Sequence, residues 1–220
     1  MSAESTRIRW PKAARRAVIY EGVTIGYNVV EGIVAVTAGL VAGSVALTGF
    51  GVDSGIEVAA ASVVLVRLLS ELRGGLVDER KERRALRFIA VTFFALAVYV
   101  VFEGVRDLVT GETPDTSPVG IVLTGLSILV MPALAWAKRR AGEQMGSRLV
   151  IADATETKLC AWLSVPTFTG LVAYALVGAT WIDSVAGFVI AWFAVREGRE
   201  AWEGELVCAE DASDDGPRPD

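Results

Sequence analysis

Six stretches of mostly apolar residues, each long enough to cross a lipid bilayer as a helix, constrain this chain more than any other feature. About 20 helical residues span the roughly 30 Å of hydrocarbon in a bilayer. The stretches are residues 17–40, 45–69, 86–108, 119–137, 149–176 and 183–201. A hydrophobic content of 53% and a mean hydropathy of +0.47 also lie on the apolar side of ordinary soluble domains. The sequence therefore predicts an all-α membrane protein, a bundle of six transmembrane helices.

The first apolar stretch is expected to stay in the protein rather than to be cleaved as a signal peptide. It is longer than the apolar core of a signal, carries Glu21 and Glu31, and lacks a small-x-small cleavage pattern. We expect three parts: a basic cytoplasmic segment over 1–16, a six-helix transmembrane domain over 17–203 and an acidic cytoplasmic tail over 204–220.

Basic residues set the expected orientation in the membrane. They gather before the first stretch, between the second and third, and between the fourth and fifth, while the alternate loops are nearly free of them. By the positive-inside rule, both termini and the basic loops are cytoplasmic, in a multi-pass protein of the plasma (inner) membrane. Topology already explains these charges, so no nucleic-acid partner is expected. The residues are Arg7, Arg9, Lys12, Arg15, Arg16, Arg73, Arg80, Lys81, Arg83, Arg84, Arg87, Lys138, Arg139, Arg140 and Arg148.

The absence of histidine and the presence of only two cysteines narrow the chemistry. Without histidine there is no Ser-His-Asp triad and no histidine-based zinc enzyme. Cys160 falls in the fifth stretch and Cys208 in the tail, so no disulfide is expected between them. An intramembrane protease is a distant alternative, because Cys160 has no histidine base and Asp53 lacks an acid-rich motif on another helix. The chain is therefore not expected to be an enzyme.

Two residue pairs with possible ligand side chains lie at membrane depth. Asp53 and Glu57 are four residues apart in the second stretch, and Glu156 and Cys160 repeat that spacing in the fifth. Residues four apart share a helix face. A charge at mid-bilayer costs about 2.5–3.5 kcal/mol or more, so it usually has a function. The two helices are antiparallel, which lets the pairs meet near the midplane and offer four ligands to a small tetrahedral cation.

Four segments together resemble the cation diffusion facilitator family. AGSVALTGFGVDSGIEVAAASVVLVRL is similar to the first loop and second helix of the family, and ADATETKLCAWLS to its fifth helix. YVVFEGVRDLV resembles the end of the third helix and WIDSVAGFVIAWFAVREGREAWEG the sixth. The resemblance covers most of the chain, from about Thr24 to Glu203, through short motifs in the right order.

The resemblance implies export of a divalent metal coupled to proton uptake. Its metal site would be Asp53, Glu57, Glu156 and Cys160, although the family's fifth helix usually has histidine or aspartate and then aspartate. The histidine-rich cytoplasmic loop of many members is replaced by the basic LVDERKERRALR. Only a tail follows Glu203, so we expect a short member without the cytoplasmic ferredoxin-like domain.

Structural roles compete with these functional ones. Asp53 and Glu57 could face an aqueous vestibule, and Cys160 could be a small buried hydrophobe. Lys158 points nearly opposite to Glu156, which argues against a salt bridge between them. Asp153 could sit in an inner vestibule, but it is interpreted mainly as an acid near the helix start, where it favours the dipole.

Other polar residues have roles that the sequence leaves open. Asp183 is interpreted mainly as a residue of a helix N-terminus. Glu21, Asn28, Glu31 and Glu103 could surround the site, carry protons or be structural. Cys208, Glu210 and Asp211 are interpreted as part of a solvated acidic tail.

Two classes of function therefore remain. The favoured one is a secondary transporter that exports a divalent metal by proton antiport. The other is a non-transporting membrane protein that binds metal or modulates a partner. No cofactor is expected. Zinc is the favoured cargo, with manganese, iron, cobalt and cadmium as alternatives, because three carboxylates suit hard cations while one thiolate suits softer ones. A homodimer stays open.

Overall fold

The computed structural model describes residues 12–72, 79–111, 115–145, 147–178 and 181–203. All the regular secondary structure in these residues is α-helix. The helices are α1 (Lys12–Ala42), α2 (Val45–Leu72), α3 (Glu79–Thr110), α4 (Pro118–Met145), α5 (Arg148–Val177) and α6 (Trp181–Glu203). The predicted six-helix, all-α architecture is confirmed. Predictions for the basic segment before Lys12 and for the acidic tail, including Cys208, lie outside the described residues.

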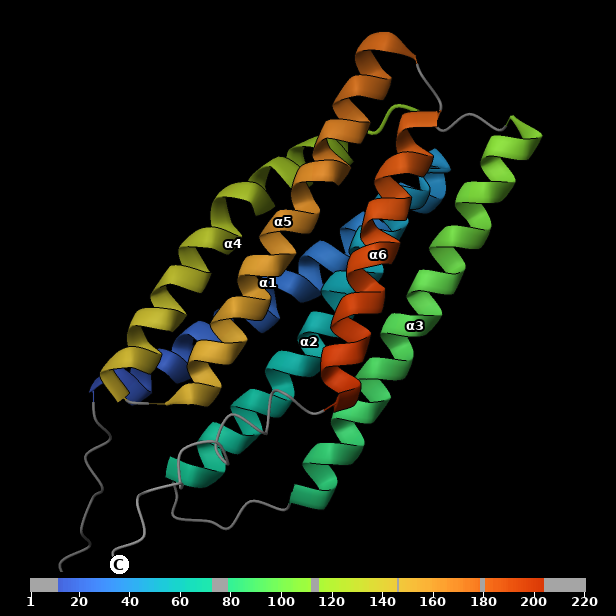
Figure 1. Cartoon of the computed structure of the whole chain (residues 1–220). Coiled ribbons are helices and arrows are strands. Elements are labelled where there is room, and N and C mark those ends of the chain that lie inside the picture. Colours follow the sequence, from blue (N-terminus) through green and yellow to red (C-terminus); the bar gives the residue numbers. More distant parts are fainter. Residues whose placement is uncertain (1–11, 73–78, 112–114, 146, 179–180, 204–220) are drawn as a thin grey trace, which may run out of the picture.

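The helices pack in antiparallel pairs within one bundle (Figure 1). The most extensive contacts join α1 to α2, α4 to α5, and α3 to α6. Helix α2 also contacts α3, α5 and α6, so it lies where the pairs meet. This placement brings the acidic stretch of α2 into the middle of the bundle, opposite α5.

Several helices extend beyond the apolar stretches that predicted them. Helix α3 begins at Glu79 and α4 ends at Met145, well outside 86–108 and 119–137. The apolar pattern marks the part of a helix suited to hydrocarbon, whereas backbone hydrogen bonding continues into charged sequence. The basic residues 80–87 and 138–140 therefore belong to helices rather than to loops, which corrects the loop assignment.

The distribution of polar and apolar side chains fits a membrane environment. Three described helical segments, Lys12–Ala42, Pro118–Met145 and Glu156–Val177, are long and apolar enough to cross a membrane by length and composition. Large apolar side chains such as Ile33, Leu129 and Trp192 point outward, while many polar ones are buried. A soluble protein shows the reverse preference. The bundle thus presents an apolar exterior around a partly polar interior.

Small residues let α1 and α2 approach closely. A Cβ at Gly51 would lie 2.6 Å from the backbone nitrogen of Val36, and one at Gly39 would lie 2.6 Å from that of Thr48. Contacts this short would force the helices apart, so both positions need glycine. Close approach through small residues is typical of helix packing in membranes.

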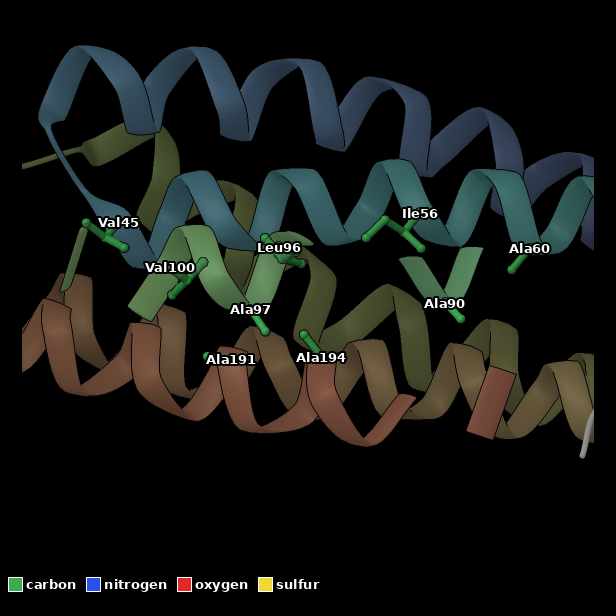
Figure 2. Close-up of a cluster of buried hydrophobic side chains, with 9 residues drawn as sticks. All are labelled: Val45, Ile56, Ala60, Ala90, Leu96, Ala97, Val100, Ala191 and Ala194. Carbon is green, nitrogen blue, oxygen red and sulfur yellow. The ribbon is translucent and has the colours of Figure 1, made fainter. Parts of the chain in front are cut away.

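A hydrophobic cluster joins α2 to α3 and α6 on the other side of α2 (Figure 2). Ile56 of α2 packs with Leu96 and Val100 of α3 and with the small Ala191 and Ala194 of α6. Glu57 follows Ile56 directly and so lies about 100° around the helix from it, whereas Asp53, three residues before Ile56, lies nearer to this cluster. Apolar packing thus fixes the rotation of α2, with Glu57 turned toward Cys160 of α5.

Candidate metal-binding site

The acidic pair of α2 lies inside the bundle. Asp53 is 5% exposed and Glu57 is partly buried. Both carboxylate oxygens of Glu57 are buried, and neither has a hydrogen-bond partner among the described residues. An unpartnered buried carboxylate is costly unless a proton or a cation compensates it. The buried carboxyl group of Glu57 therefore needs a proton or a cation to compensate it.

The pair on α5 faces the same region. Cys160 is 4% exposed, and Glu156 is partly buried. Cys160 interacts electrostatically with Glu57 and Asp53, and Glu156 interacts with Glu57. The structure thus brings the four predicted residues into one region between α2 and α5.

The four side chains do not form a ready coordination shell. Within the described part of the chain, no group of three or more Cys, Asp or Glu side chains is arranged to hold a metal ion. Cys160 packs in an apolar cluster with Met131 and Ala161, beside Tyr27. The role of the four side chains as ligands therefore stays a prediction.

Glu31 of α1 lies beside this region and is held by hydroxyl groups. It is 1% exposed and accepts hydrogen bonds from Ser54 of α2 at 3.1 Å and Ser127 of α4 at 2.5 Å. It also interacts electrostatically with Asp53 and Glu57. Of the roles left open for Glu31, the structure supports a buried polar link between three helices at the level of the site.

Lys138 is buried in the bundle rather than placed in a cytoplasmic loop. Its ammonium lies 2.9 Å from Oε2 of Glu21 and 2.5 Å from Oδ2 of Asp153. It also donates a hydrogen bond to Thr157. The sequence interpretation of Lys138 as a loop cation is wrong, and so is that of Asp153 as a residue serving only the helix dipole. The predicted apolar stretch ends at residue 137. The sequence therefore gave no indication that the side chain of Lys138, the next residue of α4, points into the bundle.

The remaining candidates divide between the surface and the interior. Glu103 pairs with Arg106 near the surface, which leaves it away from the site. Lys158 is exposed, in keeping with its predicted separation from Glu156. Asn28 is 0% exposed, and both its amide atoms lack a hydrogen-bond partner among the described residues.

Sequence reasoning missed Glu197 of α6. One of its carboxylate oxygens is buried without a hydrogen-bond partner among the described residues, and it interacts electrostatically with Asp53 and Glu156. Its position inside the sixth apolar stretch was the available signal. The neighbouring Arg196 is exposed and paired with Glu200.

Comparison with known proteins identifies the family of this bundle. Residues 85–203 match the family described as the cation efflux transmembrane domain. Relatives include the magnetosome protein MamB of Magnetospira sp. (strain QH-2), 25% identical over 185 residues that cover 81% of this chain and 61% of that protein.

Two further relatives carry names that refer to metals. The manganese efflux system protein MneS of Bacillus subtilis (strain 168) is 27% identical over 188 residues, 82% of this chain and 63% of that protein. Metal tolerance protein C1 of Arabidopsis thaliana is 29% identical over 93 residues, 42% of this chain and 20% of that protein. The chain therefore spans less than two thirds of the length of each of these relatives.

Proposed function

The chain belongs to the cation efflux family, and from that premise we propose that it exports a divalent metal cation from the cytoplasm. The family consists of membrane transporters rather than enzymes, as expected from the sequence. We further propose that the ion crosses the bundle between α2 and α5, where Asp53, Glu57, Glu156 and Cys160 serve as its ligands.

The observation that carries this proposal is the state of Glu57. Its two carboxylate oxygens are buried without hydrogen-bond partners of good geometry among the described residues, with the Cys160 thiol close by and Asp153 and Glu31 as electrostatic neighbours. A group of acids at this depth is expensive to maintain without a compensating cation. A divalent cation passing through the bundle supplies that charge.

The ligand set favours a transition metal, and whether Cys160 is a ligand decides which transition metal is preferred. A thiolate ligand selects zinc or cadmium, whereas a site that relies on carboxylates suits manganese. Zinc is the first cation to test, since four small ligands match its tetrahedral preference. Manganese is the second, because one relative bears the name of a manganese efflux protein and because Cys160 packs among apolar side chains.

We propose proton antiport as the energy source, with both termini in the cytoplasm. Metal ligands bind well only when deprotonated, so protons arriving from outside would weaken the site and help to expel the ion. Glu31, Asp153 and Glu197 also lie in electrostatic range of the four ligands and would share the charge changes. The parts 1–16, 17–203 and 204–220 are proposed to be the cytoplasmic segment, the transport domain and the tail.

The test is metal flux into liposomes that contain only this protein. Zinc, manganese, iron, cobalt and cadmium are offered separately, and initial uptake is compared with that of protein-free liposomes. Uptake of at least one cation supports a transporter. Tight binding without flux would support the alternative, a membrane protein that binds metal or modulates a partner.

A further inference from the structure

The side chain of Lys138 fills a cation site of its own in the bundle. Three oxygens surround its ammonium: Oε2 of Glu21 at 2.9 Å, Oδ2 of Asp153 at 2.5 Å and Oγ1 of Thr157 at 3.2 Å. The exposed fractions of the Lys138 and Glu21 side chains are 0%, and that of Asp153 is 3%. Ligands from α1 and α5 thus enclose a cation carried by α4.

This group of oxygens has capacity that the ammonium does not use. Oε1 of Glu21 is buried without a hydrogen-bond partner among the described residues, whereas Oε2 lies 2.9 Å from the ammonium. Two carboxylates and a hydroxyl are ligands that hard divalent cations accept. Two carboxyl groups thus face a single ammonium.

We propose that Lys138 is a tethered cation that occupies a second, inner metal site and keeps divalent ions out of it. Part of this inference, the benefit for export, rests on the proposed function. A pathway conducts only if its ions can leave, and an ion held at a second site would have to leave as well. A lysine at this position compensates the acids without trapping an ion.

The position of Lys138 relative to the α2/α5 region supports this role. Lys138 interacts electrostatically with Glu57 and with Glu156. A fixed positive charge in that range disfavours binding of a second cation next to a first one. The ammonium therefore limits the bundle to one divalent ion, carried by the ligands on α2 and α5.

The experiment counts bound Mn²⁺ in the purified full-length protein by equilibrium dialysis and by the loss of the free-ion EPR signal. Lys138→Gln is expected to bind one Mn²⁺ more than the wild type. Lys138→Arg retains the charge and should show no gain. Lys138→Gln combined with Asp153→Asn removes an inner ligand and should lose the extra ion.

A second background separates this inference from the transport proposal. In Asp53→Ala, which removes a ligand of the α2/α5 region, Lys138→Gln should still add one Mn²⁺. If the wild type binds neither Mn²⁺ nor Zn²⁺ but Lys138→Gln gains an ion, the inner site stands and the proposed function fails. If the wild type binds metal and Lys138→Gln gains nothing, the inner-site inference is overturned.

Poor folding of Lys138→Gln would also be informative. Two uncompensated buried carboxylates destabilise the bundle, and Mn²⁺ in the inner site would replace the missing charge. The folded yield of the variant, measured by size exclusion, should then rise with added Mn²⁺ but not rise in the Lys138→Gln/Asp153→Asn variant. A yield indifferent to Mn²⁺ contradicts the inference.

Discussion

Asp183, in the first turn of α6, caps the N-terminus of α2, where Ser44 precedes the helix. Its Oδ1 accepts a 2.6 Å hydrogen bond from the Ser44 hydroxyl, and its Oδ2 accepts from the backbone nitrogens of Val45 at 2.9 Å and Ala46 at 3.3 Å. A carboxylate accepts hydrogen bonds from the free N–H groups at a helix start, and its negative charge interacts favourably with the positive end of the helix dipole. This contact fixes one end of the helix that carries Asp53 and Glu57.

Asp183→Ala should therefore destabilise the bundle. Loss of charge-assisted hydrogen bonds to a buried carboxylate costs about 1.5–3 kcal/mol. Thermal unfolding in detergent should show a clearly lower midpoint for Asp183→Ala and a smaller loss for Asp183→Asn, which keeps one acceptor. Glu143→Ala, which removes an exposed carboxylate, is the matched control. Equal midpoints for Asp183→Ala and Glu143→Ala would refute the capping role.

Cys160 is predicted to decide which metal is preferred. As the single soft ligand of the four, its thiolate should strengthen zinc and cadmium binding relative to manganese. Cys160→Asp should still transport but shift preference toward manganese, and Cys160→Ala should lose affinity for all the metals, most strongly for cadmium. The measurement is initial uptake rate against metal concentration in inverted vesicles, normalised to the membrane content of each variant.

A different outcome for Cys160 has a clear structural meaning. Wild-type zinc and cadmium uptake in Cys160→Ala would make the thiol a packing residue of its cluster with Met131 and Ala161. The proposed shell would then consist of the three carboxylates, completed by water.

The predicted orientation can be read from the two ends of α4. Thr116 lies just before α4 and Glu143 lies in its last turn, and both side chains are exposed. In a background without Cys160 and Cys208, Thr116→Cys should react with an impermeant thiol reagent added outside cells. Glu143→Cys should react only after the membrane is opened, and the reverse pattern would invert the topology.

Proton antiport predicts a dependence of export on the transmembrane proton gradient. In inverted vesicles, an acidic lumen should quicken metal uptake, because protons replace the departing ion at the deprotonated ligands. A protonophore should remove that stimulation. If uptake of every transported metal is independent of the proton gradient, antiport is rejected, but the proposal that the protein exports metal still stands.

The sequence predicted those parts of the structure that depend on local pattern. Apolar stretches placed all six helices, and the four-residue spacing of Asp53 with Glu57 and of Glu156 with Cys160 placed each pair on one helix face. Contacts between distant helices were beyond such reasoning. Nothing near Lys138 in the sequence indicates that Glu21 and Asp153 surround it.

Helix rotation explains the misses. A residue one position beyond an apolar stretch points inward or outward according to how its helix packs, and packing depends on residues from other helices. Lys138 points inward, toward α1 and α5, whereas Arg139 beside it pairs with Glu143 in solvent. Composition assigns both residues to the same basic group, although only one of them lies in the core.

The most direct test of the central claim compares metal uptake by two site variants with that of a surface variant. Asp53→Asn and Glu57→Gln keep the size of each side chain but remove the charge, whereas Glu103→Gln removes a carboxylate that pairs with Arg106 away from the site. Initial zinc and manganese uptake is measured in proteoliposomes with equal amounts of each protein. The account predicts a loss of at least about tenfold in both site variants, as expected for a depleted coordination shell, and little change in Glu103→Gln. Wild-type rates in Asp53→Asn and Glu57→Gln would contradict a metal site between α2 and α5.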